Sequence, residues 1–365
     1  MKSRDLYLSM IGIDDDILEK ADRFSNRKKV SVFHRLLPVV ACICCVLFTT
    51  VTAAAAIHHF WGRGMSGFLK STDTQQQVLT DKGQAIVYKE LTDYSTYKIT
   101  DNGITISPDT VVADENFVYA SFKVIGLDID DYKEPGADVD YYLGDDKNSL
   151  VNGSSSFYDG TMIDDNGMAV YDDGTAITPD ENGNFGHYKD KNGDLEYVIQ
   201  IQAGDGLNSV LGSTLHVDFS SLGIYTGKAE FTPSVKGKWN FDLKLPTVSS
   251  SQTITVNKEV PNSNCTITTV EISPVSITVN YKVDGKLKET EDGTGIPEFI
   301  GFVLKDGTRL PFVANGGSSG FKDESRKEAV CIRGYDRVID ISKVKSLLLW
   351  PNDYGGCDKV EVKIQ

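Results

Sequence analysis

The stretch LLPVVACICCVLFTTVTAAAAI, residues 36–57, contains no charged residue and decides how the rest of the chain is arranged. As a helix, these 22 residues would be about 33 Å long, enough to cross a hydrocarbon core of about 30 Å. Pro38 falls in the first turn of such a helix, where its missing N–H costs little. The sequence therefore predicts one membrane span between a short N-terminal tail and a long C-terminal region.

The residues on either side of this span predict its orientation. Five basic residues precede it, and two histidines and two aromatic residues follow it: Arg23, Arg27, Lys28, Lys29 and Arg35, then His58, His59, Phe60 and Trp61. Basic residues stay on the cytoplasmic side, and aromatic rings suit the headgroup layer. We therefore expect a single-pass protein of the cell membrane with a cytoplasmic N-terminus and an extracellular C-terminal region.

A cleaved signal peptide is the competing interpretation of the same stretch, because residues 53–56 are four alanines and offer A-x-A cleavage sites. However, 35 residues precede the apolar run. The run is also longer than the 7–15 residues that are usual for the apolar region of a signal peptide. These two features favour a retained span.

The acidic composition limits the partners of the extracellular region. The chain has 365 residues and a formal net charge of −15. Residues 36–365 hold 29 Lys/Arg against 46 Asp/Glu, a net charge of −17. Such a charge argues against nucleic acid or anionic lipid as the partner. Cys265, Cys331 and Cys357 lie beyond the span and form at most one disulfide, which argues against a disulfide-stapled domain.

The tail, residues 1–35, has the pattern of two short amphipathic helices. Asp14 is placed to cap the second helix, which follows Gly12. Its apolar residues form the candidate partner-binding set: Ile13, Ile17, Leu18, Ala21 and Phe24. A tail of this length cannot build a core of its own. It either lies on the membrane, docks in the groove of a cytoplasmic protein, or is a solvated tail with a basic stop signal.

Residues 58–96 have the composition of a juxtamembrane stalk. Glycine occurs at positions 62, 64 and 67, and a polar run with Gln75, Gln76 and Gln77 follows. The sequence predicts a short helix near 72–79 and an edge strand near 84–88.

From Tyr97 onward, apolar residues recur with the period of two that is typical of β-strands. One group of strands covers residues 97–248 and ends with Trp239, Phe241, Leu243 and Leu245, just before Pro246. A serine-rich linker follows, and a second group covers residues 252–365. The fold class that we predict is mainly β: two tandem immunoglobulin-like β-sandwich domains outside the membrane, one transmembrane helix and a short helical tail.

Three short matches indicate that the second β region repeats the first. The matches are Ile-Ser-Pro at 106–108 and 272–274, Lys-Val-x-Gly at 123–126 and 282–285, and an alternating strand at 241–245 and 360–364. They occur in the same order in both regions, which favours two related domains.

Several stretches resemble domain-of-unknown-function family 4179. They are residues 97–106 (YKITDNGITI), 117–124 (FVYASFKV) and 237–241 (GKWNF), together with IGIDDD at 11–16. The unit from Thr266 resembles the immunoglobulin-like domain often found after it. The resemblance implies a single-pass membrane protein of Gram-positive bacteria with an anti-sigma-factor-like role beside an extracytoplasmic-function sigma factor. It implies no catalytic residues.

An acidic insertion near 127–196 is the one candidate for metal chemistry. Its calcium candidates are Asp190, Asn192, Asp194 and Glu196, because carboxylate and amide oxygens around a glycine suit Ca²⁺. However, counting twelve positions from Asp190 reaches Ile201 instead of the glutamate that an EF-hand needs. Asp-Gly and Asn-Gly pairs are also ordinary turns. We therefore predict solvated turns, and neither a metal nor another cofactor.

Catalytic motifs are weak. The Gly316-Gly-Ser318-Ser-Gly320 sequence matches a nucleophile elbow, but no apolar helix pattern follows it. His187 and His216 are the only histidines beyond the membrane edge. We therefore predict no enzyme. The leading expectation is a membrane-anchored sensor and regulator whose tail binds a cytoplasmic protein, with a sigma factor as the candidate. The alternative is a cell-surface interaction or structural protein with a β-sandwich ectodomain.

Overall fold

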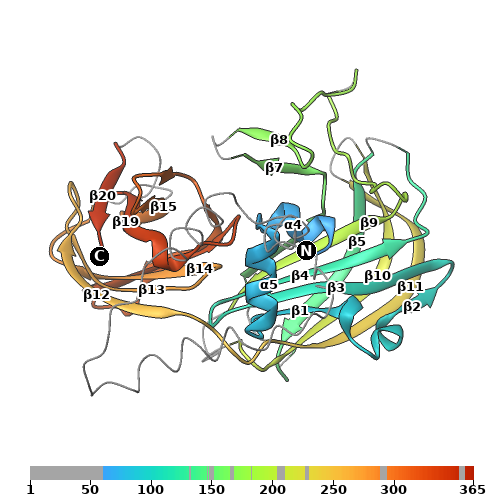
Figure 1. Ribbon diagram of the computed structural model, residues 1–365, viewed down its shortest axis with the longest axis horizontal. Helices are drawn as coiled ribbons and strands as arrows, with labels where there is room; N and C mark the ends of the chain where they lie inside the picture. Colours follow the sequence, from blue (N-terminus) through green and yellow to red (C-terminus); the bar gives the residue numbers. More distant parts are fainter. Residues whose placement is uncertain are drawn as a thin grey trace, which may run out of the picture. The chain divides into compact units, whose positions relative to one another are not determined.

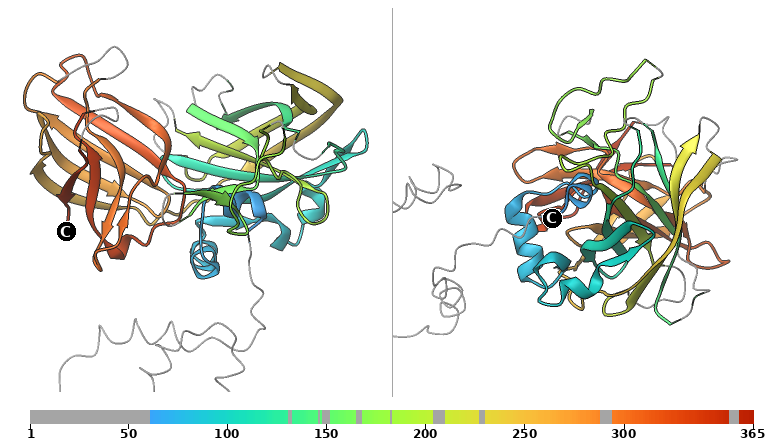
Figure 2. Two further views of the ribbon diagram at one scale, coloured as in Figure 1. Left: turned by 90° about the horizontal axis from the view of Figure 1, so that it is seen from above. Right: turned by 90° about the vertical axis from the view of Figure 1, so that its right-hand side faces the viewer.

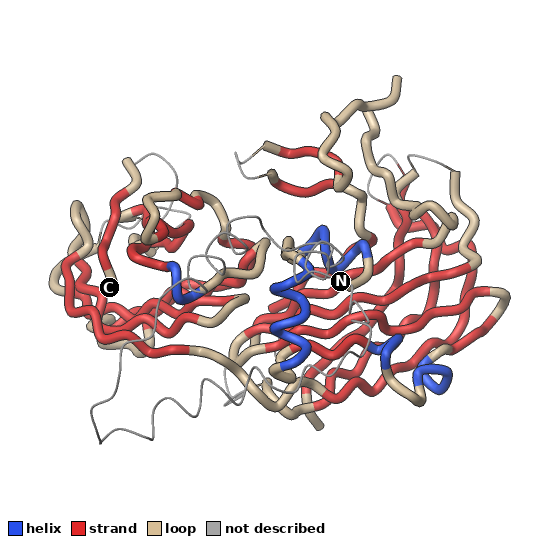
Figure 3. Tube along the Cα trace, viewed as in Figure 1, coloured by secondary structure: helices blue, strands red, loops and turns tan. Residues whose placement is uncertain are grey.

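The computed structural model describes residues 61–130, 133–145, 147, 152–164, 168–181, 183–203, 210–226, 230–287, 294–352 and 358–365. One compact unit runs from His58 to Gln365. The candidate partner-binding residues of the tail and the predicted span at 36–57 lie outside the described residues. Among the described residues, no helix is long and apolar enough to cross a membrane. The unit is mainly β, as predicted, and strands dominate its trace in Figure 3.

Two antiparallel sheets form the first half of the unit, residues 85–245 (Figure 1). The first sheet has the order β1-β3-β4-β9-β6, with β2 paired to β3, and the second has the order β11-β10-β5. The strands are β1 (Ala85–Val87), β2 (Ile99–Asp101), β3 (Ile104–Ala113), β4 (Phe117–Ile125), β5 (Pro135–Leu143), β6 (Asn152–Phe157), β9 (Leu195–Gln202), β10 (Thr214–Thr226) and β11 (Glu230–Lys244).

The core of this half lies between the two sheets. Alternate residues of β4 and β9 from the first sheet pack against alternate residues of β10 and β11 from the second: Val118, Ala120, Phe122, Val124, Tyr197, Ile199, Ile201, Leu215, Val217, Phe219, Trp239, Phe241 and Leu243. These are the inward faces that the period of two predicts, because successive side chains of a strand point to opposite faces. Trp239 is fully buried, and its indole N–H donates to the carbonyl of Ile104 at 3.1 Å.

The second half, residues 252–365, also consists of two sheets around a core. Their orders are β12-β13-β14-β18-β17 and β16-β15-β19-β20. Figure 2 shows these layers, drawn from orange to red, facing each other. The strands are β12 (Gln252–Glu259), β13 (Cys265–Ile272), β14 (Ser276–Val283), β15 (Glu298–Leu304), β16 (Arg309–Leu310), β17 (Ala314–Phe321), β18 (Glu328–Tyr335), β19 (Val344–Trp350) and β20 (Val360–Lys363).

Seven strands of the first half correspond in chain order to seven strands of the second, while β2, β7 (Thr161–Ile163), β8 (Ala169–Tyr171) and β16 have no counterpart. The sheet path β3-β4-β9-β6 of the first half matches β13-β14-β18-β17 of the second, and β11-β10-β5 matches β20-β19-β15. Additional edge strands, β1 and β12, occupy the same position beside β3 and β13. The predicted internal repeat is therefore present in the strand topology.

Two of the three sequence matches mark equivalent positions. The Lys-Val-x-Gly sequence occupies equivalent positions at the end of β4 and of β14, and the alternating pattern lies at the end of β11 and in β20. The Ile-Ser-Pro match is wrong. Ile106 pairs with Val124 near the far end of its hairpin, whereas Ile272 pairs with Ile277 beside the turn. The two tripeptides are therefore offset along equivalent hairpins.

The acidic insertion contains two strands of the sandwich. β5 and β6 lie between residues 127 and 196 and belong to the second and first sheets. The sequence of β6, Asn152-Gly-Ser-Ser-Ser-Phe157, has almost no apolar residues, because only its last residue reaches the core. What remains outside the sheets is a set of turns and the hairpin of β7 (Thr161–Ile163) and β8 (Ala169–Tyr171).

The predicted stalk is the largest difference between expectation and structure. From Trp61 onward it forms α4 (Arg63–Phe68), α5 (Asp73–Asp81), β1 and two short 3₁₀ helices, η1 (Tyr88–Glu90) and η2 (Tyr94–Tyr97). A third 3₁₀ helix of the unit, η3 (Ile341–Lys343), lies outside this segment and precedes β19. α5 begins with a capping box between Thr72 and Gln75, and β1 is an edge strand, as predicted. The segment is folded because its few apolar side chains are buried.

Candidate functional site

The first described residues, 61–70, lie against β4 and β9, and we call them the entry segment. Trp61, Met65 and Leu69 have exposed fractions of only 4%, 0% and 0%. They share one hydrophobic cluster with Phe117 and Tyr119 of β4. These two aromatic residues point away from the core between the sheets, so β4 is buried on both faces. The entry segment is therefore an integral layer of the unit.

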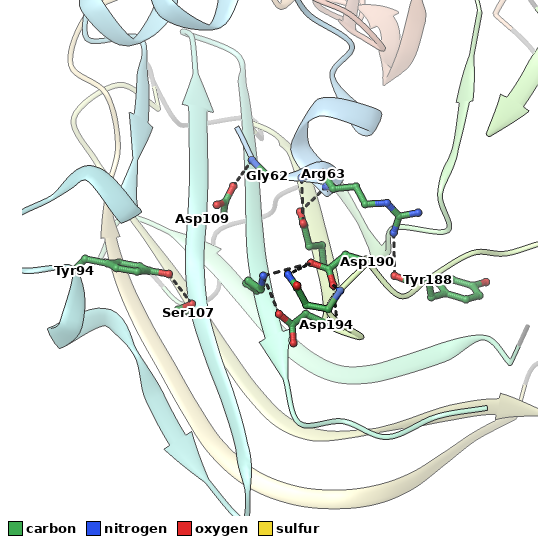
Figure 4. Close-up of polar contacts among 12 residues, drawn as sticks. Gly62, Arg63, Tyr94, Ser107, Asp109, Tyr188, Asp190 and Asp194 are labelled. Carbon is green, nitrogen blue, oxygen red and sulfur yellow. Dashed lines mark hydrogen bonds and ion pairs between the residues drawn. The ribbon is translucent and has the colours of Figure 1, made fainter. Parts of the chain in front are cut away.

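Two buried carboxylates bind the start of the entry segment (Figure 4). Asp109 Oδ2 accepts the N–H of Gly62 at 2.7 Å. Glu196 accepts the N–H of Arg63 at 3.1 Å and the N–H of Gly64. The first N–H groups of a helix have no partner inside it, and α4 has no capping side chain of its own. Asp109 and Glu196, which are distant in sequence, therefore satisfy the start of α4.

Glycine is required where the entry segment approaches its neighbours. A Cβ atom on Gly62 would lie 2.4 Å from Asp109 Oδ2, and one on Gly64 would lie 2.8 Å from Glu196 Oε2. A Cβ atom on Gly67 would lie 2.1 Å from the ring of Tyr158. The glycine pattern at 62, 64 and 67 thus permits close packing, although its composition resembles that of a flexible stalk.

The side chain of Arg63 fixes the entry segment from the other side. Its Nε donates to Asp172 Oδ2 at 2.6 Å, and its terminal nitrogens donate to the carbonyls of Tyr188 at 3.1 Å and His187 at 2.7 Å. The guanidinium carbon lies 5.1 Å from the centroid of the Tyr158 ring. Arg63 therefore ties α4 to the turns of the acidic insertion.

The environment of Glu196 changes its proton affinity. Burial raises the pKa of Glu196 to about 7, and the nearby carboxylate of Asp109 adds to the increase. The N–H groups of Gly64 and Arg63 and the ammonium group of Lys123 oppose it. A raised pKa means that the folded protein holds this proton more tightly than the unfolded chain does. The resulting stabilisation is complete below the usual pKa of 4.5, and it is lost as the pH rises through about 7.

The protein should therefore lose stability as the pH rises from about 5 to about 8, by about 3 kcal/mol from Glu196 alone. Glu196→Gln, which removes the titration, should show a smaller fall in melting temperature over this range. Glu230→Gln, a change at an exposed residue of β11, should keep the wild-type dependence. Parallel curves for the wild type and Glu196→Gln would contradict the assignment.

The entry segment and α5 also bind the second half of the unit. The N–H of Lys70 donates to the carbonyl of Asp336, and the N–H of Val338 donates to the carbonyl of Lys70, both at 2.8 Å. Gln75 Nε2 donates to the carbonyl of Val338 at 3.0 Å. The short region 61–75 thus contacts both sandwiches.

A buried carboxylate joins the two halves directly. Asp114, in the turn between β3 and β4, is only 1% exposed. Its carboxylate accepts the N–H groups of Asn116 and Phe117, both at 2.8 Å, and the hydroxyls of Ser273 and Ser276. Ser273 and Ser276 lie at the turn between β13 and β14, which corresponds to the turn that carries Asp114. Equivalent turns of the two halves therefore meet at one carboxylate.

The hydroxyl of Tyr119 is a second connection. It accepts hydrogen bonds from the N–H of Tyr335 at 3.0 Å and from Gln200 Nε2 at 3.3 Å. It donates to the carbonyl of Val275 at 3.1 Å. Gln200 Nε2 also donates to the carbonyl of Asn315 at 2.6 Å. These bonds hold β4 and β9 of the first half against the second half.

The structure separates the calcium candidates Asp190, Asn192, Asp194 and Glu196 into two groups. Asp190 and Asp194 lie 3.4 Å and 2.9 Å from the ammonium nitrogen of Lys123, and Asp190 also accepts the N–H groups of Asn192 and Asp194 within its turn. Glu196 instead binds the entry segment. Among the described residues, no group of three His, Cys, Asp or Glu side chains is arranged to hold a metal ion.

Ser318, His216 and the described cysteines lie in ordinary β structure, and His187 lies in a loop between β8 and β9. Ser318 is in the middle of β17, where its hydroxyl accepts from Gln202 Nε2 at 2.7 Å. His216 Nδ1 lies 2.6 Å from Asp242 Oδ1, and the imidazole ring stacks on the ring of Tyr142. The described cysteines, Cys265 and Cys331, are buried and free, and Cys357, His58 and His59 lie outside the described residues.

Sequence reasoning missed Asp109, Arg63 and Asp114 as residues of this site. Asp109 and Asp114 are acidic residues within and beside an apolar strand, which is a signal because buried carboxylates need partners. The glycine spacing of the entry segment was the other signal. Neither pattern identifies the partner, which comes from a distant part of the chain.

Comparisons with known proteins give no family. No family model matches the chain, and no curated protein matches it. Among solved structures, it is similar to the crystal structure of the conserved domain protein from Bacillus anthracis, with a TM-score of 0.41 and 12% sequence identity. That match covers 73% of this chain and 89% of the other. A similarity at this level carries no argument about function.

Proposed function

We propose that this chain is a membrane-anchored regulatory protein of the anti-sigma type. Its mainly β region, outside the cell, senses a condition of the envelope, and its N-terminal tail binds a cytoplasmic protein. The observation that supports this proposal is the folded entry segment. Residues that follow the predicted span are buried and bound to both sandwiches. A change in the packing of the two halves therefore reaches the residues that lead to the span, which a flexible stalk would not allow.

The strand orders support two immunoglobulin-like domains as the sensing region. In the constant-type immunoglobulin fold, strands A, B, E and D form one sheet and C, F and G form the other. If the seven corresponding strands of each half are lettered A to G along the chain, the sheet β3-β4-β9-β6 becomes A-B-E-D and the sheet β11-β10-β5 becomes G-F-C. The sheets β13-β14-β18-β17 and β20-β19-β15 of the second half give the same two orders. Domains of this class commonly serve recognition on cell surfaces, and we assign the same class of role here.

The tail tests the regulatory part of the proposal. Ile13, Ile17, Leu18, Ala21 and Phe24 would pack in a groove of the cytoplasmic partner. Truncating one buried apolar side chain costs about 1.5–3 kcal/mol, or roughly ten- to hundredfold in affinity. Leu18→Ala or Phe24→Ala should therefore derepress a reporter that depends on the cognate sigma factor. Glu19→Ala, on a neighbouring polar face, should have little effect.

Deleting residues 3–26 gives the decisive result. If the reporter and the set of proteins that co-purify with the chain both stay unchanged, the regulatory proposal fails. An anchored surface interaction protein then describes the chain better.

A further inference from the structure

A pocket of about 360 Å³ in the second half plays no part in the contacts described above. It lies among β15, β17, β18 and β19, and its lining includes Glu298, Arg333, Phe312, Trp350, Gly316 and Gly317. The glycines line the pocket with backbone alone, and β17 is irregular between Ala314 and Gly317. The polar and aromatic parts of the pocket are therefore open to a ligand.

The polar part of the pocket is an ion pair without net charge. A terminal nitrogen of Arg333 donates to Glu298 Oε2, and the two side chains are 17% and 13% exposed. The guanidinium also donates to the carbonyl of Ile332 at 2.8 Å and to the hydroxyl of Ser319 at 3.2 Å. These bonds hold the pair in one orientation. It offers acceptor and donor groups side by side to a ligand that is itself uncharged.

The aromatic part of the pocket is formed by Phe312 and Trp350. Their ring centroids are 6.1 Å apart, and the rings are inclined by 58°. Phe312 is 48% exposed, although it is a large apolar residue. Its φ angle is +61°, a conformation that is strained for a bulky side chain and that is often found at binding sites. The ammonium nitrogen of Lys359 lies 3.8 Å from the centroid of the Phe312 ring.

Trp350 also stands next to the ion pair. It is the direct pairing partner of Glu298 on the neighbouring strand, and both residues line the pocket. An aromatic ring and a carboxylate are thus presented together by two rigid strands. This arrangement suits a ligand with one apolar face and polar groups around its edge.

We propose that this pocket binds the sugar ring of a neutral carbohydrate. The apolar face of a pyranose ring, with its C–H groups, packs on Trp350 and Phe312, while adjacent hydroxyls donate to Glu298 and accept from Arg333. The net charge of −15 of the chain disfavours an anionic ligand, and the ion pair adds no net charge, so Lys359 is the one cation beside the aromatic part of the pocket among the described contacts. The proposal is independent of the regulatory role, because it concerns the second half alone.

Tryptophan emission provides a direct test. Of the three tryptophans of the chain, Trp61 and Trp239 are 4% and 0% exposed, so that Trp350 is the one open to a ligand. The full-length protein, in a detergent without a sugar headgroup, is titrated with chitotetraose, cellotetraose and maltotetraose, and with an oligogalacturonate as the anionic comparison. We expect a saturable change in emission with at least one neutral oligosaccharide, and none with oligogalacturonate.

Variants separate this pocket from nonspecific binding. Phe312→Ala and Glu298→Gln should each weaken the binding at least about tenfold. Phe185→Ala removes an aromatic ring of similar exposure, 43%, in the first half and should leave the affinity unchanged. Near-ultraviolet circular dichroism checks that both pocket variants are folded. The proposal is overturned if no neutral oligosaccharide changes the emission at about 10 mM, if oligogalacturonate binds best, or if both pocket variants bind like the wild type.

Discussion

Asp114→Ala should lower the free energy of unfolding by roughly 2–6 kcal/mol, because it leaves at least two buried N–H groups without an acceptor. The carboxylate of Asp114 accepts four hydrogen bonds. Because the residue is only 1% exposed, solvent water cannot take over these bonds when the carboxylate is removed. The alanine variant leaves the N–H groups of Asn116 and Phe117 and the hydroxyls of Ser273 and Ser276 without this acceptor. Each buried group left unpaired costs about 1–3 kcal/mol.

Urea denaturation measures this effect, with Asp340→Ala as a matched control. Asp340 is also a carboxylate that caps backbone and hydroxyl donors, because it accepts from the N–H and hydroxyl of Ser342, but it is exposed. Loss of an exposed cap costs about 1 kcal/mol. Asp114→Asn keeps one acceptor oxygen and should fall between the two. Equal losses for Asp114→Ala and Asp340→Ala would show that Asp114 does not join the two halves.

Gly67→Ala should release the entry segment from β9 and the acidic insertion. Alanine favours a helix by about 1 kcal/mol over glycine, so an isolated α4 would gain stability from this change. In the folded unit, the new Cβ would lie 2.1 Å from the ring of Tyr158, which is only 6% exposed and which lies beneath Arg63. Such overpacking costs about 1–3 kcal/mol or more. The net effect should therefore be a loss of stability, opposite in sign to the helix preference.

Trypsin reports this release, because Arg63 and Lys70 are in the entry segment. The wild type should resist cleavage at both residues, and Gly67→Ala should be cleaved at least about tenfold faster, in proportion to the population of the open form. Gly320→Ala is the control, since a Cβ on Gly320 has nothing within 4 Å. The cost of Gly67→Ala should also shrink in a Tyr158→Ala background. Resistance of Gly67→Ala to trypsin equal to that of the wild type would contradict the close approach.

The sequence predicted the parts of this fold that depend on local pattern. The alternation in β4, β9, β10 and β11 identified the core faces, because a sheet with one buried face has a period of two. The turns at Asn102-Gly103 and Asp306-Gly307 were recognisable because glycine adopts the left-handed conformation found there. β5 and β6 were missed, since their polar composition indicated a loop.

The candidate site depends on distant contacts, and for that reason the sequence did not reveal it. The sequence around Glu196 indicates only a weak calcium candidate, because its neighbours in the chain are acidic. Its actual partners are the N–H groups of Arg63 and Gly64, more than 130 residues away. A glycine-rich sequence like that of the entry segment occurs both in flexible linkers and in tightly packed helices. Only the position of Tyr158 and of the two carboxylates decides between these structures.

The strand-for-strand match of the two halves is what the duplication of one ancestral sandwich would leave behind. In equivalent positions, the outward face of β4 carries Tyr119 where β14 carries Thr278, and both lie just after the turn of their hairpin. In the first half this face is apolar and is covered by the entry segment, whereas the second half has a polar side chain there that is only 7% exposed. The two copies would therefore differ in solubility when expressed separately. The second carries the more water-compatible outer face, and the first depends on residues 61–70 to avoid self-association.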